Sequence, residues 1–71
     1  MAQTVENRAV TKLGVLLQRH SEAVALGREL IRLALCARVA DQVDYALAAE
    51  QAAEESIAEA VRLEERLRRE L

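Results

Sequence analysis

Apolar side chains recur every three or four positions through most of this 71-residue chain. From Val10 onward the first half follows a 3-4 alternation, which is typical of one side of an α-helix that packs against another helix. The second half continues the pattern with alanine in many of the apolar positions, and alanine has the highest intrinsic helix propensity. The pattern therefore predicts an all-α domain with coiled-coil-like packing.

The stretch CARVADQVDY, residues 36–45, decides whether the chain folds back on itself. Asp41 is a good helix N-cap, Asp44 would lie in the first turn of a following helix, and the heptad spacing of the first half fails beyond Ala34. Glycine, the usual residue at helix ends, is missing here, so one continuous helix is the alternative. We predict a two-helix antiparallel hairpin in a single domain, 1–71, with helices at about 4–37 and 42–69 and a turn at about 38–41.

The two halves carry opposite net charge. Residues 1–40 hold six basic and three acidic side chains, whereas residues 41–71 hold four basic and nine acidic ones. In an antiparallel hairpin this difference predicts ion pairs between Arg28, Arg32 or Arg38 and the acids of the second helix.

Residues 26–37 are apolar around most of their circumference, and a helix that is apolar on two sides needs two partners. One side would form the core of the hairpin, for which we expect Leu13, Leu17, Val24, Ile31, Ala34, Val43, Ala53, Ile57, Ala60 and Leu67. The other side would bind another protein, for which we expect Leu26, Leu30, Leu33, Ala37 and Tyr45. Because a chain this short buries a marginal core, we expect oligomerisation or a partner to complete it.

No catalytic, cofactor or metal site is expected. The chain has one histidine and one cysteine, His20 and Cys36, and lacks the Glu-x-x-His pairs of di-iron bundles. We expect His20 at the edge of the core and Cys36 to be a small buried residue. The arginines lack interleaved aromatic side chains, so nucleic acid is not an expected partner. With no long apolar run and no signal pattern at its start, the chain is expected to be cytoplasmic, with no role at a membrane.

The segment that begins with ARVADQVDY resembles a known family. An Ala-Arg-x-Ala motif leads through a short polar stretch to Tyr45, and a helix containing EESIAEAV follows. In this respect the chain is similar to the small E-component co-chaperones of type III secretion needle subunits. The positions that match are Ala37, Arg38, Ala40, Tyr45, Glu55, Ser56 and Ile57.

The resemblance implies a cytosolic helical hairpin that packs on a helical-repeat chaperone and keeps a needle subunit from polymerising. The leading hypothesis is therefore a non-enzymatic protein-interaction module of this kind. Two alternatives stay open: a homodimeric four-helix bundle that serves as a scaffold, and an RNA-binding hairpin dimer.

Overall fold

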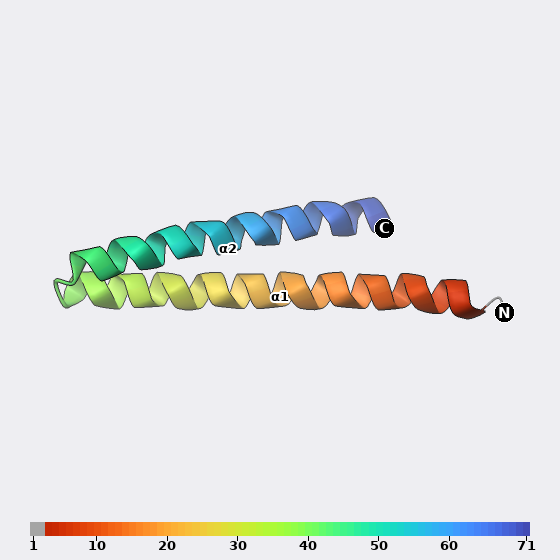
Figure 1. Ribbon diagram of the computed structural model, residues 1–71, viewed down its shortest axis with the longest axis horizontal. Helices are drawn as coiled ribbons and strands as arrows, with labels where there is room; N and C mark the ends of the chain where they lie inside the picture. Colours follow the sequence, from red (N-terminus) through yellow and green to blue (C-terminus); the bar gives the residue numbers. More distant parts are fainter. Residues whose placement is uncertain (1–2) are drawn as a thin grey trace.

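The computed structural model describes residues 3–71, with side chains from Arg8 onward. Helix α1 spans Gln3–Val39 and helix α2 spans Val43–Glu70. The two helices lie side by side and run in opposite directions, so the chain is an all-α hairpin of 60 × 15 × 13 Å (Figure 1). This confirms the predicted fold and excludes a continuous helix. The helix boundaries lie within two residues of the predicted ones.

The turn at residues 40–42 is a helix C-terminal motif built without glycine. The backbone N–H of Gln42 donates to the carbonyl of Ala37 (2.8 Å), and that of Asp41 donates to the carbonyl of Arg38 (3.1 Å). This pair of bonds defines a Schellman motif, in which the residue after the helix adopts a left-handed conformation. Asp41 has a φ of 62° and takes the place that glycine usually fills. The predicted N-cap role of Asp41 is wrong: Gln42 is the N-cap residue of α2, and its side chain makes no capping bond.

A strict 3-4 alternation forms the seam between the helices. The residues of α1 that face α2 are Leu13, Leu16, His20, Ala23, Gly27, Leu30, Ala34 and Ala37. Those of α2 that face α1 are Ala46, Ala49, Ala53, Ser56, Ala60, Leu63 and Leu67. Each set repeats every seven residues, which keeps one face of each helix against the other along their shared length.

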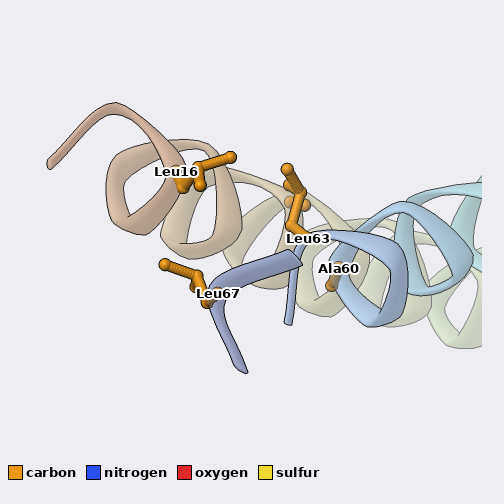
Figure 2. Close-up of a cluster of buried hydrophobic side chains, with 5 residues drawn as sticks. Leu16, Ala60, Leu63 and Leu67 are labelled. Atoms are coloured by element: carbon orange, nitrogen blue, oxygen red, sulfur yellow. The ribbon is translucent and has the colours of Figure 1, made fainter. Parts of the chain in front are cut away.

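Side-chain size changes along the seam. Near the turn the buried residues are alanines, and Ala46 is completely inaccessible to solvent. At the open end Leu16, Leu63 and Leu67 form the main hydrophobic cluster with Ala60 (Figure 2). The helices lie closer together at the turn than at the open end (Figure 1), because leucine fills a wider space between two backbones than alanine does.

The middle of the seam is held by a hydrogen bond between the helices. The hydroxyl of Ser56 donates to the backbone carbonyl of Ala23 across a distance of 2.7 Å, and Ser56 is buried. Gly27 lies beside this contact, where an added Cβ would come within 3.3 Å of Cγ1 of Ile57. A small residue at position 27 therefore permits the close approach that this hydrogen bond needs.

The observed core corrects part of the predicted one. Ala34, Ala53, Ala60 and Leu67 are buried as expected, and Leu13 and Val24 are partly buried. Four other expected core residues are 44–58% exposed, namely Leu17, Ile31, Val43 and Ile57. They flank the seam instead of filling it, because the alanines of α2 bring the helices too close for large side chains in the middle.

Candidate protein-interaction surfaces

One flank of the hairpin is rich in branched apolar side chains and is here named the valine face. Residues seven apart share one side of a helix that packs at this pitch, which places residues 10, 17, 24 and 31 of α1 in one row. Two rows of α2 border the same flank. One contains Val43 and Ile57, the other contains Leu47 and Val61, and the members of each row are two heptads apart. The valine face consists of Val10, Leu17, Val24, Ile31, Leu35, Val43, Leu47, Ile57 and Val61.

A shallow groove of about 370 Å³ runs along the middle of the valine face. Val24 and Ile31 line it from α1, and Ile57 and Val61 line it from α2. His20 also borders this groove and is half-buried, which agrees with its expected place at the edge of the core. The valine face was not predicted as a surface, since most of its members were assigned to the core.

The opposite flank, here named the leucine face, contains the predicted partner-binding residues. Leu26 and Tyr45 are more than half exposed, and Leu33 is half-buried. Leu30 is also half-buried, but it belongs to the seam and reaches this flank at the edge of a groove. A groove of about 520 Å³ lies beside Leu26 and Leu30, with Ala52 across it on α2. Charged side chains line the same groove: Arg19, Glu22, Glu55 and Glu59.

Ala37 is not part of the leucine face. Only 4% of its surface is exposed, because it packs into the seam beside the alanines of α2. Its backbone carbonyl also accepts the hydrogen bond that closes the turn. The assignment of Ala37 to a partner interface is therefore corrected to the core of the hairpin.

Within the part of the chain that the structure describes, two ion pairs connect the helices at opposite ends of the hairpin. Arg38 Nε donates to Glu50 Oε1 at 2.5 Å near the turn, and Lys12 Nζ lies 2.8 Å from Glu70 Oε1 at the open end. The hydrogen bonds from these cations lower the pKa of the Glu50 and Glu70 carboxyls. Of the three arginines that were expected to reach α2, only Arg38 does so.

The other ion pairs lie within single helices. Arg32 pairs with Glu29, three residues earlier on α1, and this hydrogen bond lowers the pKa of Glu29. On α2 the pairs are Arg62–Glu59 and Arg68–Glu64. These exposed pairs orient side chains on the surface and contribute little to stability.

The described residues offer no cluster of ligands for a metal ion. Within this part of the chain, no three side chains of histidine, cysteine, aspartate or glutamate come together in a suitable arrangement. Cys36 is exposed on α1, which corrects the expectation that it would be buried. Neither described helix has a stretch that is long and apolar enough to cross a membrane. The described residues therefore offer two grooved flanks for packing.

Comparison with known proteins gives no relative: no family model, no curated protein and no solved structure matches this chain.

Proposed function

We propose that this chain is a non-enzymatic protein-interaction module whose leucine face binds a helical partner protein. The observation that supports this proposal is the exposure of Leu26 beside a groove that is lined by both apolar and charged side chains, with Tyr45 also exposed on the same flank. Interfaces of this kind place apolar anchors in the centre and polar groups around them.

The particular role we propose is that of a cytoplasmic co-chaperone. It would bind a helical-repeat chaperone and keep a type III secretion needle subunit unpolymerised. This role depends on the resemblance of the turn and the start of α2 to the family of small E-component co-chaperones. Tyr45 belongs both to that resemblance and to the leucine face, and it is exposed at the second residue after the start of α2.

Coexpression tests this role. The chain is produced together with the needle subunit and the helical-repeat chaperone of the same genome, and the complexes are sized by chromatography with light scattering. We expect a complex of the three proteins in which the needle subunit does not form fibres. If the needle subunit polymerises equally with and without this chain, the proposed role is wrong.

Paired variants show which surface is used. L26E together with L33E introduces two charges on the leucine face, and we expect this variant to stay helical and to lose partner binding. L35E is the matched control, because Leu35 is an equally exposed leucine of α1 on the valine face. Binding that survives the L26E/L33E change, or that L35E removes instead, would show that the leucine face is not the binding surface.

A further inference from the structure

The hairpin exposes more surface to solvent than a compact protein of the same mass does. A compact protein of 7.9 kDa has a surface of about 4,400 Å², whereas this chain exposes 5660 Å². Two chains packed into one body of average compactness would together remove about 4,000 Å² from solvent. That area lies within the range of about 2,000–5,000 Å² that obligate homodimers bury. A second copy of this chain is therefore a partner of the right size.

The charges of the valine face fit a second copy. Six charged residues belong to the helix rows of this face: Arg28, Arg38, Glu50, Glu54, Glu64 and Arg68. Four of them are already joined within the chain, as the pairs Arg38–Glu50 and Arg68–Glu64. Among the ion pairs of the described residues, none includes Arg28 or Glu54. The face thus presents one cation on α1 and one anion on α2 for contact with another molecule.

These two charges lie at the same level along the hairpin. Arg28 is twelve residues before Ala40, and Glu54 is twelve residues after Gln42. At a rise of 1.5 Å per residue both are roughly 18 Å from the turn. If two hairpins are related by a twofold axis along their length, α1 of one copy faces α2 of the other at equal levels. Arg28 of each copy then meets Glu54 of the other, which makes two identical ion pairs.

The opposite orientation leaves Arg28 without an acidic partner. With the turns at opposite ends, α1 would face α1, and the described residues of α1 on this face include no acid to meet Arg28. The leucine face also fits a second copy poorly. Four charged side chains line its groove, whereas two line the groove of the valine face, and charged residues are depleted at the centre of protein interfaces.

We infer that a second copy of this chain packs on the valine face, with both turns at the same end, to form a four-helix bundle joined by two Arg28–Glu54 pairs. The groove between Ile31 and Ile57 becomes part of the shared core. The leucine face stays on the outside of each hairpin. This inference does not depend on the proposed function, because the two involve opposite flanks.

A charge-exchange experiment tests the surface and the orientation together. The readout is sedimentation equilibrium of the full chain over a hundredfold dilution, and circular dichroism reports folding. We expect the wild type to be a dimer. R28E alone and E54R alone should each self-associate about tenfold more weakly, because each homodimer then contains two contacts between like charges. An equal mixture of R28E and E54R should recover wild-type affinity, since each glutamate of one chain then meets an arginine of the other.

Other outcomes overturn the inference. A wild type that stays monomeric at 100 μM, or that forms a species larger than a dimer, contradicts the proposed bundle. A mixture of R28E and E54R that associates no more tightly than either variant alone contradicts the shared Arg28–Glu54 contact.

A second pair of variants tests the apolar part of the surface. I31Q removes an apolar side chain of the valine face and should weaken the dimer, whereas L26Q is its control on the leucine face. The L26Q variant should dimerise normally even if the leucine face binds no partner at all.

Discussion

At Asp41 the chain adopts a backbone conformation that L-amino acids other than asparagine and aspartate rarely accept. The φ of 62° closes the turn between α1 and α2, and the hydrogen bonds from Asp41 and Gln42 depend on it. A left-handed residue with a Cβ costs roughly 1–2 kcal/mol, and the short polar side chain of aspartate partly offsets this cost. The stability of the hairpin is therefore sensitive to the residue at position 41.

Replacement of Asp41 by glycine should stabilise the hairpin by about 0.5–1 kcal/mol, because glycine relieves the strain but loses more entropy on folding. Replacement by valine should destabilise it by about 1–2 kcal/mol, since a β-branched side chain fits the left-handed region worst. Urea unfolding followed by circular dichroism at one fixed protein concentration measures both. If D41G and D41V had the same effect, the left-handed turn would be contradicted.

The two glycines of α1 differ in their surroundings. An added Cβ at Gly14 meets nothing within 4 Å, whereas at Gly27 it would press on Ile57. We expect G14A to stabilise the protein by up to about 1 kcal/mol, the usual difference between glycine and alanine within a helix. We expect G27A to gain distinctly less, because Ile57 must move, and G27V to be destabilising. Thermal melting of the three variants gives the order, and G27A equal to G14A would contradict a close helix approach at position 27.

At the scale of the helices, three interactions hold α1 against α2: apolar packing along the seam, the Ser56–Ala23 hydrogen bond in its middle, and ion pairs at its ends. The packing is uneven, because alanines fill the half near the turn, whereas the buried leucines Leu16, Leu63 and Leu67 fill the open end. Truncation of a leucine should therefore cost more than truncation of any other side chain in the seam.

The L63A variant should lose about 2–4 kcal/mol of unfolding free energy, because Leu63 is only 2% exposed and its removal leaves a cavity among Leu16 and Leu67. L26A is the matched control: Leu26 is 55% exposed, so its truncation should change stability by less than about 1 kcal/mol. Chemical denaturation of both variants provides the comparison. A loss in L26A as large as that in L63A would show that the seam has been assigned to the wrong residues.

The Arg38–Glu50 pair makes the attachment of the helices weakly pH-dependent. The pKa of Glu50 is lower in the folded chain than in the unfolded chain, so its stabilising effect is complete above the unfolded pKa of about 4.5 and is lost as the pH falls through the folded value. We expect a small decrease in melting temperature between about pH 5 and pH 3.

The E50Q variant serves as the control for this pH effect. It should melt slightly lower than the wild type at pH 7, and its acid-induced decrease should be smaller, because one of the carboxyls with a lowered pKa is gone. A pH profile of E50Q that is identical to that of the wild type would mean that the Arg38–Glu50 pair is absent in solution.

At the scale of the whole molecule, a single hairpin has no interior large enough to bury a big side chain completely. Among the residues from Arg8 onward, no large side chain is less than 2% exposed, and thirteen large apolar residues are exposed. Because an associating chain is stabilised by mass action, the melting temperature should rise by a few degrees for each tenfold increase in protein concentration. Calorimetry at several concentrations measures this rise. A constant melting temperature over a hundredfold range would mean that the hairpin is stable alone.

The heptad repeat of the sequence is clear, but it specifies the buried face of α1 incompletely. Leu13 and Ala34 belong to both the predicted core and the observed seam. Each heptad needs a second buried position, and in this sequence an apolar residue is available both three and four residues after positions 13, 20 and 27. The larger side chains at Leu17, Val24 and Ile31 favoured the second choice, whereas the structure uses Leu16, Ala23 and Leu30. The regular seam of α2 from Ala46 to Leu67 is the signal that could have identified the buried face.

The sequence by itself determined the helices, their approximate boundaries and the reversal near Asp41. These features depend on local propensity, apolar spacing and charge, which act within a few residues. The tertiary structure alone decided which flank of α1 is buried, that Asp41 could replace glycine in the turn, and that Arg28 and Glu54 take part in none of the ion pairs among the described residues. These outcomes depend on how closely two backbones approach, and that distance is set by side chains from both helices at once.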